Sequence, residues 1–136
     1  MKESVTQELD YGCAIACIAF AMGVPYQDAA VLVGKKQANS SRFYVKDLLA
    51  FLNSTEGQYK SFHVKSKNRK HIYAEGLIVL IRRSKRYPTG HYLIRHEGKW
   101  MDPWINMPHE KDISKAKSGY RSRLPGNPMY GILKIS

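Results

Sequence analysis

The feature that most constrains this chain is an almost uninterrupted apolar run near its N-terminus, from Cys13 to Met22. The run contains no charged residue, and Gly23 follows it as a typical helix stop. A helix that is apolar around its whole circumference has no face for water, so it is expected at the buried centre of a domain. The run is too short to cross a bilayer, which needs about 20 apolar residues. The sequence therefore predicts a central helix around which the other elements pack.

Two further helices are expected after this run. Pro25 is well suited to open a helix over residues 26–33, and Gly34 is suited to close it. A third helix is expected over residues 44–53, where the apolar residues recur at spacings of three and four (Val45, Leu48, Leu49 and Leu52).

The remainder of the chain has the alternating or β-branched patterns of strands. The expected strands cover residues 59–64, 77–81, 91–96, 99–102 and 129–135. Glu97-Gly98 lies between two of them and can form a tight hairpin turn. Helices that precede an antiparallel sheet predict an α+β fold, with an N-terminal central helix and two further helices packed on a C-terminal sheet. Residues 1–136 are expected to form a single domain.

Length, hydrophobic content and cysteine placement narrow the class of protein. At 136 residues and 43% hydrophobic content, the chain is long and apolar enough to bury a core. Cys13 and Cys17 would lie one turn apart on the same helix, which does not favour a disulfide between them. The first ten residues are polar, so no signal peptide is expected. These features favour a reduced, cytoplasmic setting.

The net charge of +11 is high and is concentrated in one part of the chain. Residues 60–86 carry nine lysines and arginines against one acidic residue, Glu75. Such a segment can be simply a solvated basic surface, or it can bind an acidic partner, either nucleic acid or an acidic protein. No Arg/Gly-rich tail, RNA-binding aromatic signature or zinc-finger spacing favours nucleic acid.

Cys13 is the candidate nucleophile. It follows Gly12, which is expected to let the chain turn sharply into the helix, and a helix N-terminus stabilises a thiolate. Gln7 lies six positions earlier, where its side-chain amide could donate to an oxyanion. Most free cysteines are buried hydrophobes, and this interpretation is preferred for Cys17 inside the apolar run.

His91 and Asp102 are the candidate base and its orienting carboxylate. His91 starts one strand of the expected hairpin, and Asp102 ends the other. With Glu97-Gly98 as the turn, the two are expected nearly opposite each other, where Cβ atoms are about 4.5–5.5 Å apart. A slip of one residue would place them on opposite faces of the sheet. Trp100, Trp104 and Tyr92 lie near this pair and could line a substrate groove, although such residues are more often core.

A metal site is the main alternative use of the cysteines. Cys13, Cys17 and a histidine could bind zinc, but the second cysteine pair of a structural zinc site is missing and no His-x-x-x-His helix is present. No glycine-rich phosphate loop is evident. We therefore expect neither a metal nor a cofactor.

These motifs together resemble a known family. Gln7 and Cys13 before an Ala/Cys-rich helix, followed by Gly90-His91-Tyr92 and Asp102-Pro103, are similar to the bacteriocin-processing, double-glycine-leader peptidases among the papain-like cysteine peptidases. The resemblance spans most of the chain and includes residues 23–34, 44–49 and 77–81. Family members usually have Asp and Gly beside the nucleophile, where this chain has Gly12 and Ala14, and they are often part of a membrane transporter.

The resemblance implies a papain-like fold, a Cys13–His91–Asp102 triad and a peptide or protein substrate. It also implies that the Gln7 side chain and the Cys13 backbone N–H stabilise the oxyanion. The leading hypothesis is a stand-alone papain-like peptidase, of a size and charge that suit an effector, a toxin or a phage-encoded protein. The same triad could instead serve deamidation or acyl transfer, because a fold does not fix the acceptor. A third hypothesis is a polyanion-binding module on this scaffold, in which the basic segment carries the function.

Overall fold

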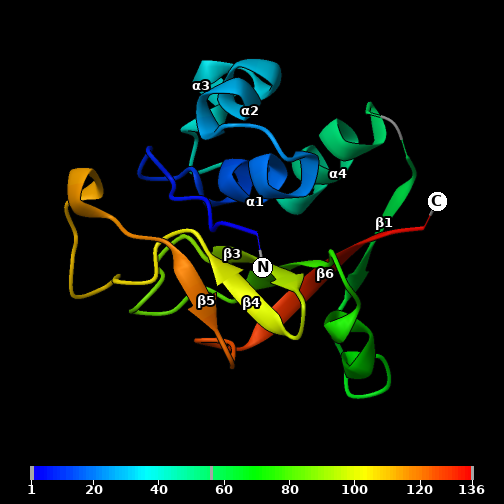
Figure 1. Ribbon diagram of the computed structural model, residues 1–136. Coiled ribbons are helices and arrows are strands. Elements are labelled where there is room, and N and C mark those ends of the chain that lie inside the picture. Colours follow the sequence, from blue (N-terminus) through cyan, green and yellow to red (C-terminus); the bar gives the residue numbers. More distant parts are fainter. Residues whose placement is uncertain (1, 56, 136) are drawn as a thin grey trace.

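The computed structural model describes residues 2–55 and 57–135 and confirms the α+β class. In the described residues, four helices lie on one face of a six-stranded antiparallel sheet (Figure 1). The helices are α1 (Cys13–Met22), α2 (Tyr26–Val33), α3 (Lys35–Ala38) and α4 (Val45–Asn53). The strands are β1 (Tyr59–His63), β2 (Ile78–Ile81), β3 (His91–His96), β4 (Lys99–Asp102), β5 (Gly119–Arg121) and β6 (Pro128–Lys134). Their order in the sheet is β1-β6-β2-β3-β4-β5, and every neighbouring pair is antiparallel.

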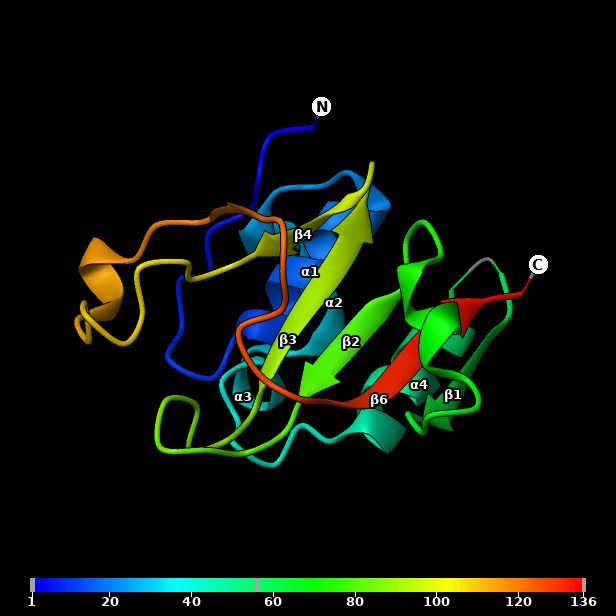
Figure 2. The same ribbon diagram turned by 90° about the horizontal axis from the view of Figure 1, so that it is seen from below.

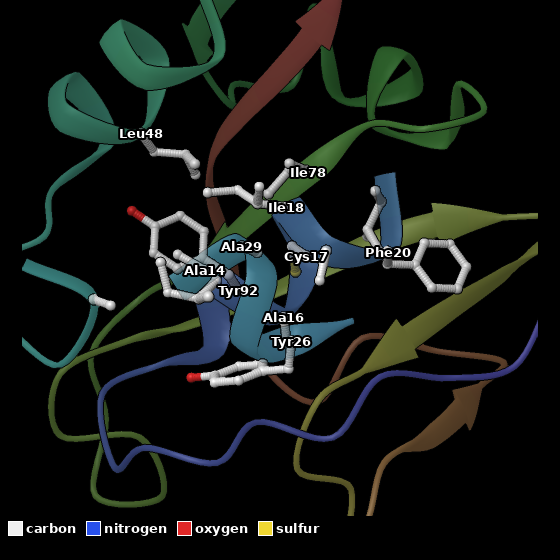
Figure 3. Packing of buried hydrophobic residues seen from close by; sticks show 14 of the residues in the cluster. Ala14, Ala16, Cys17, Ile18, Phe20, Tyr26, Ala29, Leu48, Ile78 and Tyr92 are labelled. Atoms are coloured by element: carbon white, nitrogen blue, oxygen red, sulfur yellow. The ribbon is translucent and has the colours of Figure 1, made fainter. Parts of the chain in front are cut away.

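The apolar run forms the central helix that the sequence predicts. Helix α1 lies between the sheet and the α2–α3 layer (Figure 1) and ends at Gly23, whose φ of 70° is left-handed. From Ala14 to Phe20 every residue is buried. Figure 3 shows this cluster, in which Ile18 lies beside Ile78 of β2 and Leu48 of α4. Burial on all sides explains why the run carries no charge.

The sheet is covered on both faces. Ile78, Ile94 and Met101 belong to the core that contains the helices. Their strand neighbours Val79, Leu93 and Trp100 belong to a second core with Ile72, Ile81, Leu77 and Tyr87. This second core is closed by loops and by the short 3-10 helix η1 (Arg69–Tyr73) rather than by a helical layer (Figure 2). The apolar strands are therefore buried on both faces. Their sequences show little of the alternation between apolar and polar residues that a solvated sheet face produces.

The β3–β4 hairpin turns at Glu97 and Gly98 as predicted, and both residues have positive φ, 46° and 79°. The expected register was wrong by two residues. His96 pairs with Lys99 and Ile94 with Met101, so the same register places Asp102 opposite Leu93 rather than His91. In a hairpin with a two-residue loop, the residues on either side of the loop pair with each other. This pairing sets the register of the two strands. A shift of two keeps His91 and Asp102 on the same face, as diagonal neighbours.

Several short elements were not expected from the sequence. Helix α3 has four residues, β5 has three, and a second 3-10 helix, η2 (Ile113–Lys115), also has three. Segments this short show no periodicity from which they could be predicted. The cations of residues 60–86 are distributed over β1, the segment between β1 and η1, η1 itself and the loop after β2.

In the described part of the chain, no single helix is long and apolar enough to cross a membrane. Helices α1 and α2 reach that length and composition only together, and they are bent by 109° at the break between them.

Candidate active site

Cys13 is the first residue of α1 and is half-buried. The preceding Gly12 has φ −96° and ψ 22°, a conformation open to any residue, so the expected need for a sharp glycine turn was wrong. Glycine is required by space instead, because a Cβ at this position would lie 1.9 Å from the Tyr26 hydroxyl oxygen. That hydroxyl donates a hydrogen bond to the Gly12 carbonyl at 3.2 Å, and burial raises the pKa of Tyr26 to about 12. Packing of α2 against the start of α1 thus fixes where the thiol lies.

His91 and Asp102 form a buried pair. The His91 Nε2 and Asp102 Oδ1 atoms are 2.6 Å apart, and the two residues are 2% and 0% exposed. Because Nε2 faces the carboxylate, Nδ1 is the ring nitrogen left to act on a second group. The structure therefore brings the predicted base and its orienting carboxylate together.

The charge state of His91 is set by competing effects. Burial lowers its pKa, but the Asp102 charge and hydrogen bond, together with a hydrogen bond and charge from Cys13, raise it from 6.5 to about 9. The imidazole is therefore held as the imidazolium at neutral pH. Cys13 and His91 line the same cavity, which places the thiol and the imidazole in one site.

Asp102 receives three hydrogen bonds in all. Its Oδ1 accepts from His91 and from the Trp104 backbone N–H at 3.0 Å, and its Oδ2 accepts from Arg121 Nε at 2.6 Å. Burial alone would raise the pKa of this carboxyl group. The His91 charge, followed by the hydrogen bonds from His91, Arg121 and Trp104, lowers it to about 2. The carboxylate is thus kept ionised and fixed in place.

Arg121 was missed by the sequence analysis. It lies on β5 and is held by a second bond, from Nη2 to the Ile105 carbonyl at 3.0 Å. Asp102 pairs with Gly119 of the same strand, so Arg121 reaches the carboxylate diagonally, as His91 does from β3. No sequence pattern distinguishes Arg121 within the 22 lysines and arginines, because its strand has only three residues.

Tyr87 was also missed. Its ring stacks on the His91 ring with a centroid separation of 4.6 Å and an interplanar angle of 2°. The Arg86 guanidinium in turn lies over the Tyr87 ring at 5.4 Å. Tyr87 is buried in the second core, so the stack fixes the plane of the imidazole.

Gln7 lies in the same cavity as Cys13 and His91 and is 2% exposed. Its backbone N–H donates to the Pro103 carbonyl at 3.1 Å, which ties the N-terminal segment to the residue after Asp102. Its side-chain Nε2 donates to the carbonyls of Leu9 and Asp10 at 3.0 and 3.3 Å. The carboxamide is therefore fixed at the cavity wall with both of its N–H groups engaged, and among the described residues its Oε1 has no partner. In this arrangement Gln7 has no free donor, and its part in stabilising an oxyanion stays a prediction.

The cavity that joins these residues has a volume of about 330 Å³. Besides Gln7, Cys13 and His91, it is lined by two of the three aromatic residues considered as groove residues, Tyr92 and Trp104. The third, Trp100, lies in the second core. The thiol, the imidazole and the Gln7 side chain thus border one concave site.

Cys17 lies one turn deeper and is fully buried in the core. Burial raises the pKa of its thiol well above the ordinary value, which makes Cys17 unreactive. Among residues 2–55 and 57–135, no group of three or more His, Cys, Asp or Glu side chains is placed to hold a metal ion.

Comparisons of the chain with protein-family models, with curated proteins and with solved structures found no match. The resemblance to double-glycine-leader peptidases therefore rests on the motifs and on the site that they form.

Proposed function

We propose that this protein is a cysteine peptidase that hydrolyses a peptide bond through Cys13, His91 and Asp102. The observation that supports it most is the order of groups in the site. A buried carboxylate lies 2.6 Å from one nitrogen of His91, and a half-buried thiol at a helix N-terminus lines the same cavity as that ring. A nucleophile, a base and a group that orients the base are the parts of a triad.

In the proposed reaction His91 already holds the proton that Cys13 has given up, so the cycle starts from a thiolate–imidazolium pair. The sulfur forms a bond to the substrate carbonyl carbon, and the carbonyl oxygen takes up the electron pair. When the oxygen returns that pair, the carbon–nitrogen bond breaks and the imidazolium gives its proton to the leaving amine. The acyl group then remains on the sulfur as a thioester.

A water molecule completes the cycle. His91 takes a proton from water, the hydroxide adds to the thioester carbonyl, and the carbon–sulfur bond breaks to release the acid. The oxyanion forms near the Cys13 backbone N–H, which belongs to the first helical turn and has no intrahelical acceptor. The Gln7 carboxamide becomes the second donor when it releases one of its two bonds to the Leu9 and Asp10 carbonyls. Loss of one such donor typically costs about 2.7–4 kcal/mol of barrier. Asp102 keeps the imidazole in one tautomer and orientation throughout.

A proteome-derived peptide library tests the proposal against many candidate substrates at once. The wild-type protein should generate new peptide termini that mass spectrometry identifies. Cys13→Ala should abolish them, whereas Cys17→Ala, a matched loss of one thiol, should retain the cleavage. Cleavage by the Cys13→Ala protein would refute the assignment.

The same experiment, with an amine added to the reaction, separates the three chemistries open to this triad. Hydrolysis of a backbone amide divides a peptide in two, whereas deamidation of glutamine leaves its length unchanged and adds about one mass unit. Acyl transfer would join an added amine to the acyl fragment. If deamidated peptides or amine adducts appear in place of new termini, the protein is a deamidase or a transferase that uses the same triad.

A further inference from the structure

Two further cavities adjoin the Cys13 cavity, one on each side. One has a volume of about 430 Å³ and shares Ser41, Phe43, Thr89, Gly90 and Tyr92 with it. The other has a volume of about 660 Å³ and shares Pro88, Trp104 and Met107. The three cavities are therefore contiguous through the one that Cys13 lines, and we call them together the groove.

The two ends of the groove differ in chemistry. The smaller end is mostly apolar, with Val45, Leu49, Leu80, Ile81 and Met129 in its wall, although Lys46 and Arg83 also line it. The larger end is basic: all its ionisable lining residues are cations or histidine, namely Lys85, Arg86, His109 and Lys111. These residues come from the β2–β3 and β4–β5 connections, which lie at the same side of the sheet (Figure 2).

We propose that the basic end of this groove binds the carboxylates of an acidic peptide segment on one side of the bond that is cut. The inference rests on the proposed function and specifies its substrate class: a peptide with acidic residues on one side of the scissile bond and an apolar residue on the other.

The first argument is charge complementarity within a concave surface. Lys85, Arg86 and Lys111 converge on one cavity with no acidic residue in its wall. Glu110 and Asp112 are their neighbours in the chain, but Glu110 accepts a bond from the Asp112 N–H, and Asp112 caps Ser114. Cations that face one concavity without a protein counter-ion favour an anionic ligand.

The second argument is a buried donor without a partner. Trp104 is 4% exposed, and among the described residues its Nε1 has no acceptor, although the side chain lines both the basic cavity and the Cys13 cavity. An indole N–H at such a position usually binds an acceptor. Because this nitrogen is closed to solvent, a carboxylate or backbone carbonyl of the bound peptide would reach it after a shift of the indole.

A third observation connects the basic end to catalysis. Arg86 lies over Tyr87 at 5.4 Å, and Tyr87 stacks on His91 at 4.6 Å. A carboxylate held by Arg86 would therefore lie one aromatic ring away from the base, close to the scissile bond. At the basic end this arrangement favours a peptide over nucleic acid, because base stacking needs an exposed aromatic face and the tryptophan there, Trp104, is buried.

Binding can be tested without turnover by using the Cys13→Ala protein. Fluorescence anisotropy at physiological ionic strength would compare a labelled hexaglutamate peptide, a hexaglutamine peptide and a single-stranded oligonucleotide. The binding of each ligand would be measured on the Cys13→Ala protein and on the same protein that also carries Lys85→Glu and Lys111→Glu. Lys67→Glu with Lys99→Glu is the matched control, since both lysines are exposed and neither lines the groove.

We expect the hexaglutamate peptide to bind at least about tenfold more tightly than hexaglutamine, because close charges at a protein surface interact by several kcal/mol before screening. The Lys85/Lys111 reversal should remove that preference, and the Lys67/Lys99 reversal should leave most of it. Equal binding of the two peptides, or equal effects of the two double variants, would overturn the inference. So would tighter binding of the oligonucleotide with the same dependence on Lys85 and Lys111.

The cleavage library separates this inference from the proposed function. Wild-type cuts with acidic residues enriched on one side support both. Cuts without that enrichment retain the peptidase and overturn the substrate class. Selective binding of hexaglutamate with no Cys13-dependent cleavage retains the anion-binding groove and overturns the peptidase.

Discussion

Three donors from different parts of the chain converge on Asp102: His91 from β3, Arg121 from β5 and the Trp104 backbone N–H after β4. A buried carboxylate is costly unless it is paired and hydrogen-bonded, and here both of its oxygens are bonded. The charge that remains on Asp102 is what raises the pKa of His91 against the effect of burial. At the scale of single residues, the proposed chemistry depends on this carboxylate.

Replacement of Asp102 by Asn should reverse the direction of the His91 shift. Without the carboxylate charge, burial is the largest remaining influence, so the pKa of His91 should fall from about 9 to below its ordinary 6.5. An NMR titration of the His91 ring measures this directly and does not depend on activity. A His91 that titrates at the same pH in both proteins would contradict the electrostatic account.

Arg121→Gln should lower the free energy of unfolding by about 2 kcal/mol, the scale of a hydrogen bond to a charged group. Arg121→Lys should recover only part of the loss, because an ammonium cannot bond Asp102 and the Ile105 carbonyl with the geometry of the guanidinium. Arg123→Gln is the matched control two residues away, at an exposed position where the change should stay within about 0.5 kcal/mol. Urea denaturation measures all three, and equal effects of Arg121→Gln and Arg123→Gln would show that Arg121 does not support the site.

At the scale of elements, the sequence predicts the helices and strands whose apolar residues recur with a regular period. The bounds of α1 and α2 agree with the expectation because Gly23 and Gly34 end apolar runs, and the β3–β4 turn is set by Glu97-Gly98. The short strand β5 has too few residues for a pattern, so Arg121 could not be found. The stacking of Tyr87 on His91 depends on where a loop folds back, which no local pattern encodes.

The start of α1 offers a prediction about packing between elements. Gly12→Ala should destabilise the protein by about 1–3 kcal/mol, because the added Cβ meets the Tyr26 hydroxyl. Tyr26→Phe alone should cost about 1 kcal/mol through loss of its hydrogen bond to the Gly12 carbonyl. The double variant should be less destabilised than the sum of the two, since the atom that clashes has been removed. Thermal unfolding of the four proteins tests this, and simple additivity would refute the steric explanation.

At the scale of the whole molecule, the fold brings part of the excess positive charge together at one place. The sequence places nine cations within residues 60–86, but only the fold shows that Lys85 and Arg86 meet Lys111 from another loop beside the thiol. This convergence depends on the β2–β3 and β4–β5 connections, which are far apart in the chain. Composition alone could therefore suggest an acidic partner without indicating where it binds.

The His91–Asp102 pair should also shape the pH dependence of global stability. The folded pKa of His91 is raised from 6.5 to about 9, so its contribution is complete below about pH 6.5 and is lost as the pH rises through 9. Asp102, lowered from 3.8 to about 2, contributes above about pH 3.8 and loses its contribution as the pH falls through 2. The stability difference between wild type and Asp102→Asn should thus be greatest between about pH 4 and 6.5.

That difference should shrink by about 3 kcal/mol between pH 6.5 and 9, because one pKa unit corresponds to about 1.4 kcal/mol. It should not vanish, since Arg121 keeps its bond to the carboxylate. Urea denaturation of both proteins across this range provides the measurement. A difference that stays constant with pH would mean that the pair does not stabilise the fold through charge.

The central claim is that His91 activates Cys13, and site-resolved alkylation by iodoacetamide tests it most directly. At neutral pH, Cys13 should react much faster than the buried Cys17, and His91→Ala should slow the Cys13 reaction at least about tenfold. Both thiols should react equally in the unfolded chain. A Cys13 rate that is unchanged by His91→Ala, or faster labelling of Cys17, would contradict the account.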